Sequence, residues 1–222
     1  MAHGDSVWVA TRGTSQLIEF DAATRTERRR VDLPAPAHHL AVRHDGARIY
    51  AARFRSPDDH GEVYELDGAT LETISLRRGP GPDTADGGRG TPNLLGALRI
   101  SPDGRSVFVP SASHNLERGV VRDGLPLNTD NTVRAIVSAI DLESGRERET
   151  ARLDLDDHEG PSAVALSPRG DVLFVATRGT HRVDAFDFST GRVLSNFGTA
   201  FTPDGLVAVS YTPLTLPPIH PV

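Results

Sequence analysis

The fold is decided by Leu98-Arg-Ile-Ser-Pro-Asp-Gly104 and by Val107-Phe-Val109, which follows it closely. The first stretch alternates apolar and polar residues as a short strand does. It ends in Pro-Asp-Gly, where proline presets the backbone of the turn and glycine accepts a positive φ. The second stretch is short, apolar and rich in residues that favour strands. Together they predict two antiparallel strands joined by a tight turn.

The same unit occurs four times along the chain. Related strand-and-turn segments stand at 40–46 and 164–170, and related second strands at 7–10, 49–52 and 173–176. Third strands that end in aspartate are expected at 17–21, 63–67, 136–141 and 183–187, and fourth strands at 29–33, 73–76, 149–153 and 193–197. Each terminal aspartate precedes a turn, where its carboxylate can accept hydrogen bonds from backbone N–H groups two residues on. The hexapeptide Val-Ala-Thr-Arg-Gly-Thr, present at 9–14 and again at 175–180, indicates duplication.

Four short strands per unit without helical periodicity favour an all-β chain built as blades of a propeller. We expect residues 1–208 to form a partial β-propeller of about four four-stranded antiparallel blades, WD-repeat-like, with the ring not closed. Tyr50, Phe108 and Phe174 stand at matching positions, so we expect them to lie between neighbouring sheets. The turn glycines recur after 58 and 66 residues, whereas a plain blade takes roughly 40 to 45, which indicates insertions.

The units resemble YVTN-type bacterial β-propeller repeats, through the Ser-Pro-Asp-Gly turn, the Phe-Val strand and the aspartate that precedes Thr-Gly. Residues 109–127 and 131–142 further resemble the long-insert blade of exported bacterial propellers associated with di-haem cytochrome c peroxidase-like domains. This resemblance implies a periplasmic or extracellular parent protein that acts beside a c-type haem electron-transfer or peroxidase domain, with haem c in a missing or partner domain.

Composition limits the function further. Net charge is −6, and all 24 basic residues are arginines scattered among 30 acids, which argues against a nucleic-acid-binding stripe. Without cysteine, these residues form no disulfide, no thiolate metal site and no covalent haem attachment. Apolar runs are too short to span a membrane, and the first residues lack the features of a signal peptide.

The last fourteen residues, 209–222, differ in composition from the rest, because charge disappears and proline becomes frequent. They resemble the translated sequence of a transposase adapter. We therefore expect a non-native segment there, and the alternative is a natural proline-rich or disordered terminus.

Topology predicts one working face. Strand direction alternates within a blade, so the insertions at 78–92 and 112–132 should emerge together, opposite the tight turns, and long loops on a rigid scaffold often bind partners. The candidate binding residues are Arg118, Arg122, Asp123, Asn128, Asp130 and Asn131. The alternative is a solvated loop, or one packed on another domain, whose polar residues stabilise turns.

No histidine pair has diagnostic metal spacing. His38, His114 and His158 are weak candidates for a metal site, and ordinary loop histidines are the alternative. Asp156 and Asp157 precede His158 in an acidic stretch that reads most simply as a solvated loop.

Catalytic motifs are not recognisable, so we expect no catalytic activity from these residues alone. The leading hypothesis is a non-catalytic docking propeller with a protein partner or a fused haem domain. The alternative is a propeller enzyme of the lactonase or amine dehydrogenase heavy-chain type, with substrate at the central mouth.

Overall fold

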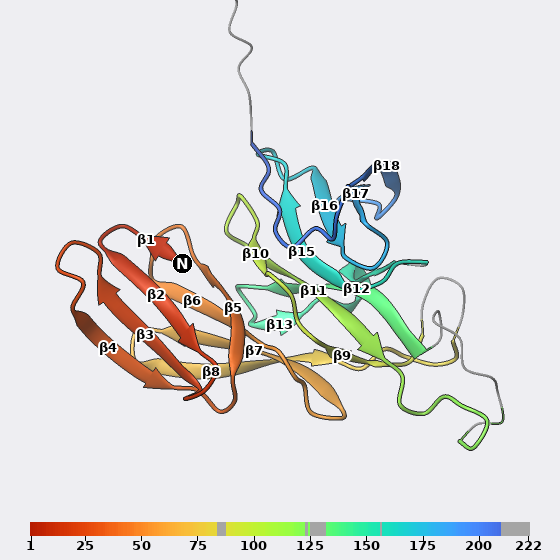
Figure 1. Cartoon of the computed structure of the whole chain (residues 1–222), viewed down its shortest axis with the longest axis horizontal. Coiled ribbons are helices and arrows are strands. Elements are labelled where there is room, and N and C mark those ends of the chain that lie inside the picture. Colours follow the sequence, from red (N-terminus) through yellow and green to blue (C-terminus); the bar gives the residue numbers. More distant parts are fainter. Residues whose placement is uncertain (84–87, 123, 125–131, 156, 210–222) are drawn as a thin grey trace, which may run out of the picture.

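The computed structural model describes residues 1–83, 88–122, 124, 132–155 and 157–209, which form four antiparallel sheets in succession along the chain (Figure 1). The first sheet has the order β1-β2-β3-β4, and the second has the order β5-β6-β7-β8. Their strands are β1 (Ala2–His3), β2 (Ser6–Thr11), β3 (Gln16–Asp21), β4 (Glu27–Asp32), β5 (Ala37–Val42), β6 (Arg48–Arg53), β7 (His60–Asp67) and β8 (Thr70–Arg77). The up-and-down order within each sheet is the one expected of a propeller blade.

The fourth sheet repeats this plan, and the third elaborates it. The fourth sheet contains β15 (Pro161–Leu166), β16 (Val172–Thr177), β17 (Arg182–Asp187) and β18 (Val193–Gly198). The third sheet contains β9 (Thr91–Asn93), β10 (Arg99–Ile100), β11 (Ser106–His114), β12 (Val133–Asp141), β13 (Arg146–Glu147) and β14 (Leu153–Leu155). Both β9 and β10 pair with β11, and both β13 and β14 pair with β12. The third sheet therefore keeps the four strand positions of a blade, but two short strands share its first position and two share its fourth.

The single fourth strand expected at 149–153 is wrong. A 3-10 turn, η1 (Glu149–Ala151), separates β13 from β14. There the amide of Ala151 donates to the carbonyl of Arg148 at 2.9 Å and the amide of Arg152 donates to the carbonyl of Glu149 at 3.2 Å. These local hydrogen bonds replace the backbone hydrogen bonds to β12, so the fourth strand of this sheet is interrupted for one turn between β13 and β14.

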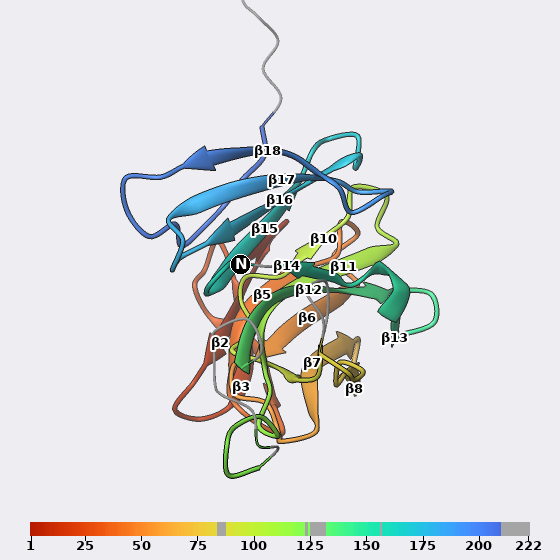
Figure 2. The same ribbon diagram turned by 90° about the vertical axis from the view of Figure 1, so that its right-hand side faces the viewer.

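The four sheets succeed one another through the molecule (Figure 2). The core of the described residues consists of three apolar clusters, one between each pair of successive sheets. Trp8, Tyr50 and Phe108 occupy the same register position in their sheets, and each is at most 3% exposed. Trp8 packs in a cluster with Ile49 of the second sheet, and Tyr50 packs in a cluster with residues of the third, including Leu95, Leu98 and Val107. Phe108 packs with residues of the fourth sheet. An aromatic plug between sheets is therefore confirmed for Tyr50 and Phe108.

Phe174 differs from this expectation. It has the same register position as Tyr50 and Phe108, opposite Ala165 and Ala185, yet it is only half-buried. The reason is its position in the last of the four described sheets, where no further described sheet faces it. Phe174 instead lines a groove on the outer face of the fourth sheet.

Aspartates at the ends of the third strands make the expected turns in three of the four sheets. Asp21 accepts hydrogen bonds from the amides of Ala23 and Thr24, and Asp187 does so from those of Ser189 and Thr190, at 2.7 to 3.0 Å. The Asp141 carboxylate accepts from the Ser144 amide at 2.8 Å. In the second sheet Asp67 pairs directly with Thr70 in a tighter hairpin.

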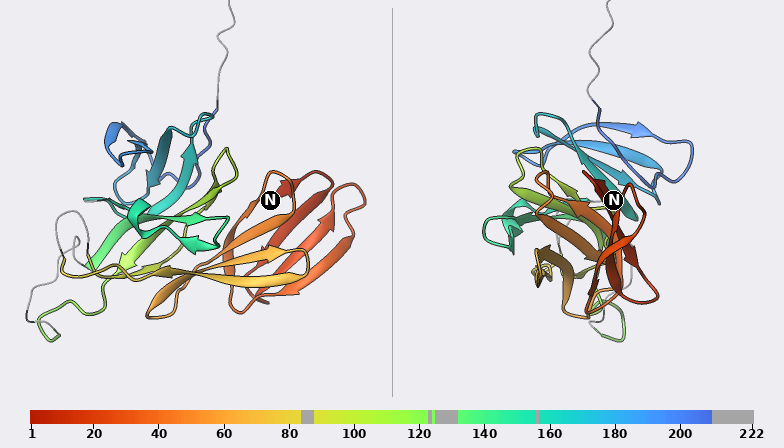
Figure 3. Two further views of the ribbon diagram at one scale, coloured as in Figure 1. Left: turned by 180° about the vertical axis from the view of Figure 1, so that it is seen from behind. Right: turned by 90° about the vertical axis from the view of Figure 1, so that its left-hand side faces the viewer.

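The molecule has two faces at opposite ends of its strands. The turns with Gly46, Gly104 and Gly170, whose φ angles are 70° to 74°, form the turn face. β11 runs from the turn face to the other end, where the described parts of 78–92 and 112–132 lie together (Figure 3). We call this end the insertion face. Within the described residues, no helix is long and apolar enough to cross a membrane.

Candidate functional site

The insertion face carries a network of charged and polar groups that we call the insertion cluster. It consists of Arg78, Asp83, Arg89, Asn115, Glu117 and Arg118. Three of these residues come from the segment after β8, and the other three come from the segment after β11. The segments are held together by β9, which pairs with the end of β11. Two insertions far apart in sequence thus form one surface.

Asp83 is the centre of this cluster, with a side chain that is 8% exposed. Its carboxylate accepts hydrogen bonds from the Arg89 amide at 2.8 Å, from Arg89 Nη2 at 3.2 Å and from Asn115 Nδ2 at 3.2 Å. Nη1 of Arg118 lies 3.6 Å from the same carboxylate. Burial raises the pKa of the Asp83 carboxyl, but the hydrogen bonds from Arg89 and the charges of Arg89 and Arg118 outweigh it, so the pKa is lowered.

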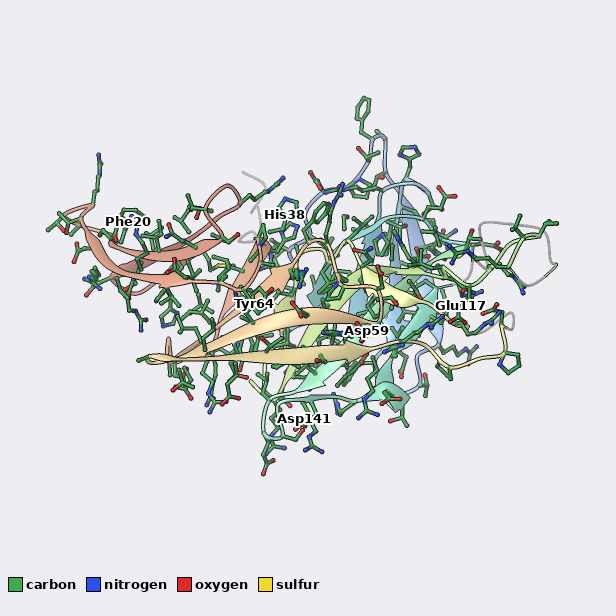
Figure 4. The ribbon with its side chains drawn as sticks, turned by 90° about the horizontal axis from the view of Figure 1, so that it is seen from below. Phe20, His38, Asp59, Tyr64, Glu117 and Asp141 are labelled. Carbon is green, nitrogen blue, oxygen red and sulfur yellow. The ribbon has the colours of Figure 1, made fainter. Side chains whose placement is uncertain are left out.

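Glu117 links the two insertions a second time. Its carboxylate lies 2.8 Å from Arg78 Nη1 and 3.5 Å from Arg89 Nη1. The hydrogen bond from Arg78 lowers the pKa of Glu117, and the charge of Arg78 adds to this effect. Figure 4 shows Glu117 at the opposite end of the molecule from Phe20 of the first sheet. The partly exposed guanidinium groups and the exposed carboxylate give this surface both signs of charge.

A second group, which we call the mouth cluster, gathers at the inner strands on the insertion face. It consists of Arg12, His38, His39, Phe54 and Arg178. Nε2 of His38 is hydrogen-bonded to Arg12. The centroid of the His38 ring lies 4.4 Å from the centroid of the His39 ring and 4.7 Å from that of the Phe54 ring. Arg12 and Arg178 are the arginines of the two duplicated hexapeptides, so the repeat itself places a cation here twice.

The imidazoles of the mouth cluster are neutral at physiological pH. Burial lowers the pKa of His39 to about 4, and His38, Arg178 and Arg12 act in the same direction. Burial, Arg12 and Arg178 also lower the pKa of His38. Two guanidinium groups therefore provide the positive charge of this region, and Arg178 also forms an ion pair with Asp204.

Of the candidate binding residues, the structure describes Arg122 and Arg118, and their surroundings differ. Arg122 is exposed and donates to the carbonyl of Leu116. Arg118 is not the exposed loop residue that we expected, because its side chain is 13% exposed and pairs with the buried Asp83. The other four candidates, Asp123, Asn128, Asp130 and Asn131, lie outside the described residues.

The three candidate histidine ligands are not brought together. His38 bonds Arg12, His114 lies 3.5 Å from Asn93, and His158 lies 2.9 Å from the buried carboxylate of Asp184. Burial lowers the pKa of His114. Among the described residues, no group of three or more metal-ligating side chains surrounds a common point. Asp156, the first member of the acidic stretch, lies outside the described residues.

Sequence reasoning missed Asp83 and the partner of His158. Asp83 stands in a glycine-rich and proline-rich segment, where a carboxylate ordinarily indicates a turn. Two of its partners, Asn115 and Arg118, come from a segment about thirty residues away. Asp184 is fully buried on β17, where it accepts from Arg182 Nε at 2.9 Å. An aspartate inside an otherwise apolar strand, two residues after an arginine, is the signal that could have found this pair.

Comparisons with known proteins support the fold. No family model matches the chain, and no curated protein matches it in sequence. Among solved structures, Kuenenia stuttgartiensis hydrazine synthase matches with a TM-score of 0.73 and 15% identity, over 92% of this chain and 62% of that one. A chain of the mitotic checkpoint complex matches with a TM-score of 0.61 and 14% identity, over 91% of this chain and 50% of that one. The chain thus spans less than two thirds of either, and the likeness identifies a β-propeller-like fold with the ring not closed.

Proposed function

We propose that this chain is the docking portion of a propeller protein and that its insertion face receives a protein partner. The observation that carries this proposal is the insertion cluster, in which two long insertions are joined by hydrogen bonds and ion pairs around Asp83. A surface loop fixed in this way loses little conformational entropy when a partner binds, so more of the contact energy becomes affinity.

The charges of the insertion face suit a polar protein contact. Arg78 is about one-third exposed and the Glu117 side chain is half exposed, while their shared hydrogen bonds fix where each charge stands. Complementary charges at the rim of an interface mainly guide orientation and speed of association. Arg78 and Glu117 therefore both join the two insertions and present charge to a partner, whereas Asp83 and Arg118 lie largely buried beneath them.

The partner we propose is a domain with covalently bound c-type haem, of the electron-transfer or di-haem peroxidase kind. Support comes from the sequence of the long third-unit insertion, which resembles that of exported propellers encoded with such domains. In this proposal the chain supplies no haem ligand itself. The parent protein would act in the periplasm or outside the cell, where c-type haem domains work.

A direct test measures binding to a purified soluble di-haem c-type peroxidase domain by biolayer interferometry. Arg122→Glu reverses an exposed charge on the insertion face, and Arg169→Glu makes the same change on the turn face. We expect the first change to weaken binding at least about tenfold, as loss of an interfacial charge contact does, and the control to leave it nearly unchanged.

Two results would contradict the proposal. Equal weakening by both variants would place the contact elsewhere or reduce it to net charge. If the wild-type chain did not bind the di-haem domain, the proposed haem partner would be wrong. If a screen of other exported domains then showed no binding that Arg122→Glu weakens, the proposed docking role of the insertion face would be wrong as well.

A further inference from the structure

A polar pocket of about 460 Å³ opens on the turn face, between the third and fourth sheets. The third sheet contributes the turn between β10 and β11, the turn after β12 and Arg148, and the fourth contributes the turn between β15 and β16 and Phe188. Figure 4 labels Asp141, which forms part of its wall. A volume of this size is typical of small-molecule sites, and both walls are sheets that face each other within the chain.

The first two sheets place a glutamate at one register position of their third strands. Glu19 and Glu65 both lie opposite the aromatic residue of the second strand. The Glu19 carboxylate accepts a hydrogen bond from Ser6 Oγ at 2.6 Å and lies 3.3 Å from Nε of Arg29, which stands opposite it on the fourth strand. The Glu65 carboxylate lies 2.8 Å from Arg48 Nη1. In both sheets, a carboxylate of the chain itself thus neutralises an arginine near the turn face.

The third sheet keeps the serine and the arginine but lacks this carboxylate. Ser106 has the register position of Ser6. Arg148 lies opposite Ala139, which stands where Glu19 stands in the first sheet. Nη2 of Arg148 donates to Ser106 Oγ at 2.8 Å, and its Nε is buried without a hydrogen-bond partner. Within the part of the chain that the structure describes, Arg148 therefore has no carboxylate partner.

The rest of the pocket carries both signs of charge. Arg105 and Arg169 are exposed at its rim, as is Glu143. The carboxylates of Asp103 and Asp141 accept hydrogen bonds from backbone amides of their own turns, at 3.1 Å and 2.8 Å. These charges nearly balance one another, so specific recognition depends on the half-buried arginine that lacks a carboxylate.

We propose that this pocket binds a small dicarboxylic acid, with one carboxylate beside Ser106 and Arg148 in the position that Glu19 and Glu65 occupy in the first two sheets. The hydrogen bond to Ser106 fixes the orientation of the guanidinium. A planar guanidinium held in this way matches a carboxylate better than it matches a spherical anion, because it presents parallel N–H donors.

The other lining residues suit the rest of such a molecule. Arg105 and Arg169 at the rim are within the same pocket and supply a cation for the second carboxylate. Leu166 and Phe188 supply an apolar wall for the carbon chain between the two carboxylates. The site lies on the turn face, so this binding is independent of the docking function proposed for the insertion face.

Isothermal titration calorimetry of the whole chain with succinate tests this assignment. Arg148→Gln removes the cation, and Arg29→Gln makes the same change at the same register position of the first sheet, where Glu19 is already the partner. We expect Arg148→Gln to weaken succinate binding at least about tenfold, as loss of a hydrogen bond to a charged group does. Arg29→Gln should leave the affinity nearly unchanged.

A second variant supplies the missing carboxylate from within the chain. Ala139→Glu gives the third sheet the residue that the first two sheets have at this position. Its carboxylate should pair with Arg148 and displace succinate, so we expect no measurable binding. Circular dichroism checks that the β-sheet spectrum is kept. If this variant fails to fold, the comparison of Arg148→Gln with Arg29→Gln decides alone.

Several results would overturn the proposal. A wild-type chain that binds no succinate at millimolar concentration would do so, as would equal weakening by the two glutamine variants. Undiminished binding by folded Ala139→Glu would place the acid at another site. Inorganic phosphate is the comparison ligand, and phosphate bound as tightly as succinate would show that the pocket does not select carboxylates.

Discussion

Asp83 shows how one side chain organises two distant segments. It is nearly buried, yet its negative charge is balanced by Arg89 and Arg118 and its oxygens accept several hydrogen bonds. A buried carboxylate with such partners favours the folded state only while it is ionised. The insertion face therefore depends on the protonation of this one group.

Replacing Asp83 with Asn should destabilise the chain by about 1 to 3 kcal/mol at pH 7, because the hydrogen bond from the Arg89 guanidinium and the ion pair with Arg118 are weakened at a buried site. The lowered pKa adds a pH signature. Stability from Asp83 is fully present above the unfolded pKa of about 3.9 and is lost as pH falls through the lower folded pKa. Urea unfolding of both proteins should thus show a gap that narrows in acid. Asp58→Asn, at an exposed carboxyl, is the control, and a pH-independent gap would contradict the account.

His39 also makes the free energy of unfolding fall as pH drops, but over a higher range of pH than Asp83. Its folded pKa of about 4 lies below the unfolded value of about 6.5, so the unfolded chain binds more protons between these limits. We expect stability to fall as pH drops from about 6.5 to about 4, and the wild type should lose more than His39→Gln. An NMR titration of the imidazole protons gives the midpoint directly. A midpoint near 6.5 would show that the ring is solvated and that the mouth cluster is not buried.

Individual elements show what the sequence alone predicts well. The tight turns at Gly46, Gly104 and Gly170, the second strands and three of the four aspartate turns depend on neighbouring residues, and the structure has them where the pattern placed them. The break of the third sheet's fourth strand at η1 depends on local backbone hydrogen bonds. The composition of residues 149–153 is strand-like and gives no sign of these bonds. The insertion cluster depends on contacts between segments that are distant in sequence. Strand topology was enough to predict the face on which these segments lie, but it could not identify Asp83 as their link.

The aromatic plugs allow a matched test of packing between sheets. Phe108 and Phe174 occupy the same register position, but Phe108 is 1% exposed between two sheets and Phe174 is half-buried. Phe108→Ala should cost about 3 to 5 kcal/mol, as for a large buried side chain, and Phe174→Ala clearly less. Urea unfolding of each variant measures both costs. Equal costs would mean that the outer face of the fourth sheet is as well covered as the interior.

At the scale of the whole molecule, each apolar cluster of the described residues lies between two neighbouring sheets, so most of the packing energy is shared along a line of sheets as in other repeat proteins. The interior sheets have two partners and the end sheets have one. This arrangement should produce a gradient of local stability from the middle of the arc to its ends.

Amide hydrogen exchange followed by mass spectrometry should reveal that gradient. All but the end residues of β11 and β12 are buried, whereas every residue of β18 is exposed and no residue of β4 is buried. We expect the slowest exchange in β11 and β12 and the fastest strand exchange in β18 and β4. The edge strand β8 provides the matched comparison, because it has the same rank in its sheet but alternates exposed with buried residues and should exchange at an intermediate rate. Uniform protection across all four sheets would instead mean that the arc opens only as one cooperative unit.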